Sequence, residues 1–342
     1  MSRTMTAVLL GLVCAGGLLA AAGKLEIYWI DAEGGAATLI VSPSGESILV
    51  DTANRTPDDR DARRIFAAAQ HAGLQRIDIL LTTHFHSDHI GGMAALAKLI
   101  PIGMYMDHGE SVEIARPQVA AAYKTYVEQS AGKRRILKAG DTIPLKGVDI
   151  DVIMSAGQAI PKALQGAGAP NAACADFKPH GEEPDPDNDQ SVGFVLRFGK
   201  FRFIDMGDLT WNYEQKLVSP VNLIGTVDLF QTTHHGLDRS NSPQFVWAIQ
   251  PKVVVMNDGP HKGGPPSVFE TLRRSPGLED IWQVHLALDT PKEINTGEHM
   301  IANLGTSAEC KGNWLEVSVD PDGRYTLINQ RNGYSKAYES KR

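Results

Sequence analysis

The chain is best understood from residues 83–89, which read Thr-His-Phe-His-Ser-Asp-His. This stretch places three imidazoles and a carboxylate directly after the apolar run 77–81, which predicts a strand. His84 and His86 lie two apart on an extended segment, so their side chains project to the same side. A solvated turn with Asp88 as a helix N-cap is the structural alternative. Four ligand-type residues at one strand-to-helix junction favour a site for zinc or a neighbouring transition metal.

Ligand-type residues also follow strands in the second half of the chain. Gly207-Asp208 comes after a predicted strand at 201–204, and His234-His235-Gly236 comes after one at 227–232. In both halves these residues stand where apolar strands end, as expected at the open rim of two packed sheets. Residues 155–190 lack an apolar period and are rich in Gly, Ala, Pro, Asn and Asp, which predicts a long functional loop or lid. The turn residues Pro321-Asp322-Gly323 predict a closing hairpin.

The first 22 residues have the features of a secretory signal peptide. Arg3 precedes the apolar run 7–22, and Ala20-Ala21-Ala22 offers a small-residue cleavage site. We therefore expect a protein exported to the periplasm or secreted, with no transmembrane domain after signal cleavage; a retained anchor is the alternative. Residues 23–342 are expected to form a single domain with a C-terminal extension at 287–342.

The net charge limits the expected partners, and the cysteine count suggests a covalent cross-link. The formal net charge of −7 argues against a broad basic face, so no stable nucleic-acid complex is expected. Cys14 would leave with the signal peptide, and Cys174 and Cys310 would remain. In an oxidising compartment these two predict a disulfide bond, and two free thiols are the alternative.

The order and spacing of the motifs resemble those of the metallo-β-lactamase superfamily across about residues 25–260. The matching features are Asp51 in Ile-Leu-Val-Asp-Thr, the run 84–89, Gly207-Asp208 and His234-His235-Gly236. The pattern from Asn188 to Gly236 is similar to the branch that contains the hydrolase domain of ComEC-type proteins and secreted phosphorylcholine esterases. The resemblance implies an α/β fold, a four-layer αββα sandwich of two mixed sheets flanked by helices.

The resemblance also implies two divalent transition-metal ions, zinc in the first place with manganese or iron as alternatives. The side chains that would hold them are His84 and His86 for the first ion, Asp88, His89 and His235 for the second, and Asp208 between them. His234 would be a substrate-facing or outer group, although the sequence leaves open which of His234 and His235 binds metal. Asp51 would orient the motif loop rather than bind metal.

One departure from the family pattern leaves the first ion short of a ligand. The family places a third histidine just before the strand pair that leads to Asp208, whereas residues 185–190 read Asp-Pro-Asp-Asn-Asp-Gln. We expect His180, a little upstream, to take this role. Asn188 and Asp189 are the alternatives.

These features predict a hydrolase whose metal ions lower the pKa of a bound water. Asp88 and His234 are the predicted catalytic residues, Asp88 because it would orient the nucleophile or relay its proton. A phosphodiester or related ester, small or extracellular, is the expected substrate. Arg239 and Ser240 would hold its phosphate or simply form a surface turn. The alternatives are acyl hydrolysis by a lactonase or β-lactamase, a non-catalytic member of the fold, and an iron redox member.

Overall fold

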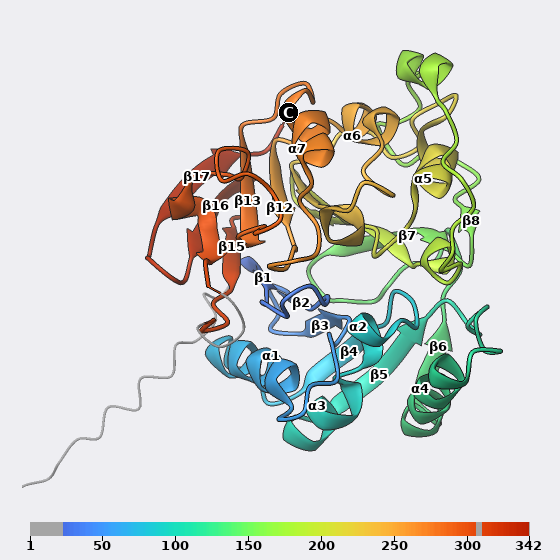
Figure 1. The fold of residues 1–342 in the computed structure, drawn as a ribbon, viewed down its shortest axis with the longest axis vertical. Coiled ribbons are helices and arrows are strands. Elements are labelled where there is room, and N and C mark those ends of the chain that lie inside the picture. The colour runs from blue at the N-terminus through green and yellow to red at the C-terminus, as the bar shows by residue number, and fades with distance from the viewer. Residues whose placement is uncertain (1–22, 306–309, 342) are drawn as a thin grey trace, which may run out of the picture.

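Two mixed β-sheets form the framework of the protein (Figure 1). The first has nine strands in the order β17-β16-β15-β1-β2-β3-β4-β5-β6, and the second has eight in the order β14-β13-β12-β11-β10-β9-β7-β8. The structure, a computed structural model, describes residues 23–305 and 310–341. The predicted signal peptide at 1–22 therefore lies outside the described residues.

The first sheet is built from both ends of the chain. Strands β15, β1, β2 and β3 are antiparallel, whereas β3 to β6 run parallel. The expected C-terminal extension supplies three strands of this sheet, β15, β16 and β17. Of these, β15 pairs with β1 in the interior of the sheet. The bounds are β1 (Leu25–Trp29), β2 (Thr38–Val41), β3 (Ser47–Val50), β4 (Ile77–Leu81), β5 (Ile102–Asp107), β6 (Arg134–Ile136), β15 (Leu315–Val319), β16 (Arg324–Asn329) and β17 (Ser335–Glu339).

The second sheet is parallel from β10 to β14 and antiparallel at β7, β9 and β10. Its interior strand β12 reads Val-Val-Val-Met and is wholly buried, as expected for a parallel strand covered on both faces. The bounds are β7 (Asp149–Ser155), β8 (Gln158–Ala159), β9 (Gly193–Phe198), β10 (Phe201–Asp205), β11 (Leu229–Gln231), β12 (Val253–Met256), β13 (Asp280–His285) and β14 (Ile301–Asn303).

Helices cover the outer face of each sheet (Figure 1). They are α1 (Arg60–His71), α2 (Ser87–Ile90), α3 (Met93–Leu99) and α4 (Pro117–Gln129) on the first sheet, and α5 (Trp211–Val218), α6 (Pro243–Ile249) and α7 (Pro266–Arg273) on the second. One apolar cluster lies between the sheets, and a further cluster lies under each helix layer. This arrangement confirms the predicted αββα sandwich. No helix in the described part of the chain is long and apolar enough to cross a membrane.

The segment 155–190 is mostly irregular, as predicted. After the last residue of β7, it contains only β8 and two short 3-10 helices, η1 (Ala172–Asp176) and η2 (Asn188–Gln190). Further 3-10 turns are η3 (Thr233–Gly236) and η4 (Glu298–Met300).

The predicted disulfide between Cys174 and Cys310 is wrong, because both residues are free thiols. The Sγ of Cys174 lies 3.3 Å from the carbonyl oxygen of Val218, at the end of α5. The Sγ of Cys310 lies 2.8 Å from Oδ2 of Asp31, which follows β1. The two cysteines thus pack against different segments, and a disulfide requires their Cα atoms to lie within about 7 Å of each other.

A buried amide joins the two sheets near the predicted site. Oε1 of Gln231, the last residue of β11, accepts hydrogen bonds from Nε1 of Trp29 at 2.8 Å and Oγ1 of Thr38 at 2.7 Å. Both donors belong to the first sheet, and all three residues are buried. The amide therefore satisfies two donors that have no access to water.

We expect Gln231→Leu to lower the free energy of unfolding by about 2–4 kcal/mol, because it leaves two buried donors without an acceptor. Urea denaturation followed by circular dichroism measures the change. The matched control is Gln70→Leu on the exposed face of α1, which should stay within about 0.5 kcal/mol of the parent protein. Equal stability of the two variants would contradict the role of the junction.

Candidate metal centre

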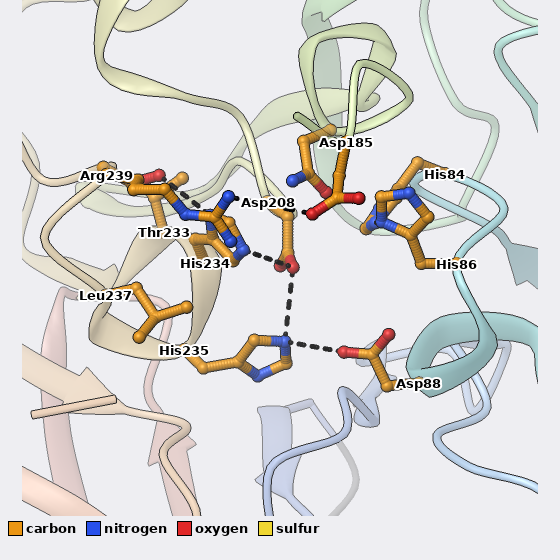
Figure 2. Close-up of polar contacts among 12 residues, drawn as sticks. His84, His86, Asp88, Asp185, Asp208, Thr233, His234, His235, Leu237 and Arg239 are labelled. Carbon is orange, nitrogen blue, oxygen red and sulfur yellow. Dashed lines mark hydrogen bonds and ion pairs between the residues drawn. The ribbon is translucent and has the colours of Figure 1, made fainter. Parts of the chain in front are cut away.

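Residues predicted from three separate motifs meet at one edge of the two sheets (Figure 2). β4 ends just before the loop that carries His84 and His86, and the short helix α2 then presents Asp88. β10 leads directly to Asp208, and β11 leads to η3 with its two histidines. The structure thus brings together these side chains, which the sequence places after strands.

Four of these side chains form a tight cluster. Ligand-type atoms of Asp88, His89, Asp208 and His235 all lie within 4.8 Å of one another. Nε2 of His89 is 3.2 Å from Oδ2 of Asp208 and 3.3 Å from Nε2 of His235. Nε2 of His235 lies 3.4 Å from an oxygen of each aspartate. Two carboxylates and two imidazoles are a donor set that suits zinc or a similar divalent ion.

The outer hydrogen bonds fix which nitrogen each imidazole offers to the cluster. Nδ1 of His89 lies 2.7 Å from Oδ2 of Asp51, and Nδ1 of His235 lies 3.3 Å from the carbonyl oxygen of Asn257. Both acceptors face Nδ1, so each Nδ1 donates outward and each Nε2 is the nitrogen that faces the cluster. Burial opposes the charged form of His89, but the carboxylates of Asp208, Asp51 and Asp88 raise its pKa well above the ordinary value, so a bound cation would replace its Nε2 proton.

Asp51 holds His89 and the loop before it in position. Besides His89, its carboxylate accepts hydrogen bonds from the backbone N–H of Thr83 at 2.8 Å and from Oγ1 of Thr83 at 2.7 Å. The residue is buried and has a φ of 61°. The expected orienting role therefore agrees with its geometry.

The other side of the site contains the facing pair His84 and His86. Nε2 of His84 lies 2.8 Å from Nδ1 of His86. Burial, with neighbouring His89 and His86, holds the pKa of His84 well below its ordinary value, so this imidazole is neutral at pH 7. On the far side of the pair, Nε2 of His86 lies 3.3 Å from Oε1 of Glu113.

His180, the expected third ligand of the first ion, does not reach the cluster. It is exposed, its ring stacks on Trp211 with centroids 4.5 Å apart, and its backbone bonds to Asn212. Asp189 bonds instead to Thr210. Asn188 is the remaining candidate: it lines the same cavity as His86 and Asp208. Its Oδ1 is buried without a hydrogen-bond partner among the described residues.

The two consecutive histidines after β11 diverge. His235 joins the four-residue cluster, whereas Nε2 of His234 lies 3.4 Å from Oδ2 of Asp208 and its Nδ1 lies 3.3 Å from Oγ of Ser240. Burial lowers the pKa of His234 to about 4. Both residues have a φ of 55°, a conformation that non-glycine residues adopt at a cost and that is enriched at functional sites.

The carboxylates of the cluster are ionised. Burial by itself favours the neutral form of Asp208, but His235, His89 and His234 hold its pKa well below the ordinary value. An ionised carboxylate among imidazoles is ready to bind a cation without itself losing a proton.

Three residues near the site were not identified from the sequence. Lys262, in the loop after β12, contacts Oδ2 of Asp88. Asp187 accepts hydrogen bonds from the backbone of Phe85 and from Oγ of Ser111, and so holds the histidine loop. Glu113 contacts His86 as described above. Like Asp208, Lys262 lies in a segment that follows a strand of the second sheet. Its position after a strand was therefore visible in the sequence.

Comparison with known proteins agrees with this geometry. The family model described as "Metallo-beta-lactamase superfamily" matches residues 30–255. The chain belongs to this superfamily. The predicted resemblance is therefore confirmed.

Individual relatives resemble only parts of the chain. A metal-dependent hydrolase of Cupriavidus necator is 38% identical over 92 residues, which are 26% of this chain and 28% of that protein. Recombination protein 2 of Haemophilus influenzae is 25% identical over 253 residues, 73% of this chain and 26% of that protein. ComE operon protein 3 of Bacillus subtilis is 22% identical over 194 residues, 55% of this chain and 20% of that protein. The matches thus span about a quarter of these relatives' lengths.

Among solved structures, the metallo-beta-lactamase fold protein YhfI from Bacillus subtilis is similar to this chain. It is 11% identical, covers 75% of this chain and 96% of its own, and has a TM-score of 0.45.

We expect Asp51→Asn to weaken metal binding about 10- to 100-fold, because the amide no longer offers an anionic acceptor to His89. Competition with a fluorescent zinc chelator measures the affinity. Asp58→Asn, at an exposed position of the same region, is the matched control and should bind like the parent. Parent-like affinity of the Asp51 variant would show that Asp51 does not orient the ligand.

Proposed function

We propose that this protein is a binuclear metal-dependent hydrolase that acts on a phosphodiester or related ester. The observation that carries the proposal is the position of Asp208. Its Oδ2 lies 3.2 Å from Nε2 of His89 and 3.4 Å from Nε2 of both His234 and His235. A carboxylate oxygen between several imidazoles is suited to bridge two cations.

The ligand set follows from the contacts. His84, His86 and the unpartnered Oδ1 of Asn188 would hold a first ion. Asp88, His89 and His235 would hold a second, with Asp208 shared between the two. Zinc suits these nitrogen and oxygen donors, and manganese and iron are the alternatives. When bound, such ions lower the pKa of water and polarise the scissile group of the substrate.

Asp88 has the geometry of a group that orients the attacking water. Its side chain is 20% exposed and lines the cavity, while its Oδ2 contacts Lys262. Burial opposes ionisation, but His89, His235 and Lys262 hold the pKa of Asp88 well below its ordinary value. A carboxylate of low pKa is a weak base, so it would position the water by accepting a hydrogen bond rather than remove its proton outright.

The cavity supports a small anionic substrate. It has a volume of about 340 Å³, and its lining includes the cations Arg116, Arg239 and Lys262, the apolar Phe85 and Val119, and the carboxylates of Asp88, Glu113, Asp185 and Asp208. The cations would attract a phosphodiester, and the apolar wall would accommodate its leaving group. Of the predicted phosphate-binding pair, Arg239 lines the cavity, whereas Ser240 is buried and donates to the carbonyl oxygen of Leu209.

Acidic residues of the long loop pair with both arginines of the cavity, and Figure 2 shows one of them, Asp185, near Arg239. Arg239 lies 2.9 Å from Oε1 of Glu183, and Arg116 lies 3.1 Å from Oδ1 of Asp185. The substrate anion would replace these carboxylates as a partner of the guanidinium groups. Export remains part of the proposal and rests on the sequence of residues 1–22 alone.

We expect bis(4-nitrophenyl) phosphate to be cleaved faster than a chromogenic cephalosporin or lactone. Asp208 between two cations would let the site grip two oxygens of a displacement at phosphorus, whereas an acyl substrate offers only one carbonyl oxygen. Initial rates at equal metal occupancy measure the ranking. Faster turnover of the cephalosporin or the lactone would favour acyl hydrolysis, and turnover of none of them in fully metallated protein would favour a non-hydrolytic role.

We expect His234→Ala to lower kcat about 100-fold while the metal content is retained, because His234 would stabilise the transition state from the edge of the cluster. Elemental analysis and initial rates on the same sample separate the two effects. His71→Ala, exposed on α1, is the matched control and should keep both. A proportional loss of metal and activity would instead make His234 a metal ligand.

A further inference from the structure

A second cluster of ligand-type side chains lies outside the centre described above. Atoms of Asp31, His285 and Cys310 all lie within 4.8 Å of one another. Asp31 and His285 are fully buried, and Cys310 is half-buried. Two ligand atoms on one zinc ion, at about 2.0–2.3 Å each, can lie at most about 4.6 Å apart, so a small adjustment would bring all three onto one ion.

His285 offers an unused lone pair in the interior. Its Nδ1 lies 3.1 Å from the carbonyl oxygen of Leu286, which can only accept, so Nδ1 carries the proton. Its Nε2 therefore presents a lone pair, and this atom is buried without a hydrogen-bond partner among the described residues. A buried acceptor without a partner destabilises the folded chain, and a bound cation would remove that cost.

Asp31 and Cys310 are held together by Arg64. The guanidinium group donates to Oδ2 of Asp31 at 3.0 Å and to the carbonyl oxygen of Cys310 at 3.2 Å. Its charge is offset by Oε1 of Glu33 at 3.1 Å. Gly312 permits this approach, since a Cβ there would lie 2.3 Å from Nε of Arg64. Outer groups that fix two ligands in this way are typical of metal sites.

A reactive thiol is a poorer explanation of the cluster. Burial and the Asp31 carboxylate raise the pKa of Cys310 to about 12, so the thiol is a weak nucleophile at neutral pH. A plain hydrogen bond from Sγ to Asp31, at 2.8 Å, would also leave Nε2 of His285 unexplained.

We propose that Asp31, His285 and Cys310 form a separate mononuclear site for zinc or a similar thiophilic divalent ion. Binding would form a metal–sulfur bond and release the thiol proton to water. Asp31 follows β1, His285 ends β13 and Cys310 leads into β15. The ion would therefore join the first sheet to the second.

Solvent can reach this site from one side. A cavity of about 380 Å³ is lined by Cys310, Lys311 and Arg331. A water molecule from this cavity would complete four-coordination. The proposal does not depend on the hydrolase function, because none of its three residues belongs to the first centre.

Cobalt(II) substituted for zinc tests the proposal, since a thiolate ligand gives a cobalt charge-transfer band that nitrogen and oxygen ligands do not. The proposed ligands of the first centre include no cysteine, so the band reports on this site. We expect it in the parent chain and in the controls Cys174→Ser and Cys14→Ser. It should be lost in Cys310→Ser and strongly reduced in His285→Gln. The zinc content of both variants should fall by about one ion per chain.

Wild-type protein provides a second readout that does not depend on the folding of a variant. Zinc should protect Cys310 from alkylation, and a chelator should abolish the protection, as mapped on the Cys310 peptide by mass spectrometry. A missing cobalt band in folded parent protein, a band that survives Cys310→Ser, or alkylation of Cys310 unaffected by zinc would overturn the proposal. Loss of activity through the first centre alone would change none of these measurements.

Discussion

The buried carboxylate of Asp51 is the constraint on which the rest of the site depends. It stands at the end of β3, and its acceptors hold Thr83 and His89, which follow the neighbouring parallel strand β4. Burial raises the pKa of Asp51 despite the opposing effect of His89 and Thr83. Burial of this carboxylate is therefore favourable only when Thr83 and His89 of the histidine loop donate hydrogen bonds to it. The pairing of β3 with β4 and the orientation of the imidazoles thus depend on each other.

Thr83 transmits the same constraint to the second sheet. Its carbonyl oxygen accepts the backbone N–H of Val192 at 2.9 Å, and its side chain lies against Gly207. A Cβ on Gly207 would lie 2.7 Å from Cβ of Thr83, and the residue has a φ of 54°. Only glycine therefore lets Asp208 approach the histidine loop so closely. The carboxylate between the imidazoles is a product of contact between the two sheets.

The sequence predicted those features of the structure that depend on a local pattern of residues. Apolar runs located the strands, and polar residues after them located His84, Asp88, Asp208 and His235, because strand ends share one rim. The pattern did not predict β17, whose sequence Ser-Lys-Ala-Tyr-Glu alternates weakly in hydrophobicity. The pattern predicted that residues 155–190 are irregular, but it could not predict the path of this loop, which is fixed by distant partners. His180 stacks on Trp211, and Glu183 pairs with Arg239, neither of which the loop's own sequence can indicate.

The two proposed metal sites use one structural principle with different donors. Each gathers side chains from strand ends of both sheets, and in each a peripheral acceptor or guanidinium fixes the ligand orientation. The first offers only nitrogen and oxygen atoms, which tolerate several divalent metals, whereas the thiol of Cys310 favours softer ions. A centre that must exchange ligands with substrate gains from the harder set. A site that joins β1 to β13 gains from the slower exchange of a thiolate. The donor atoms would therefore suit the first site to a reaction and the second to stabilising the fold.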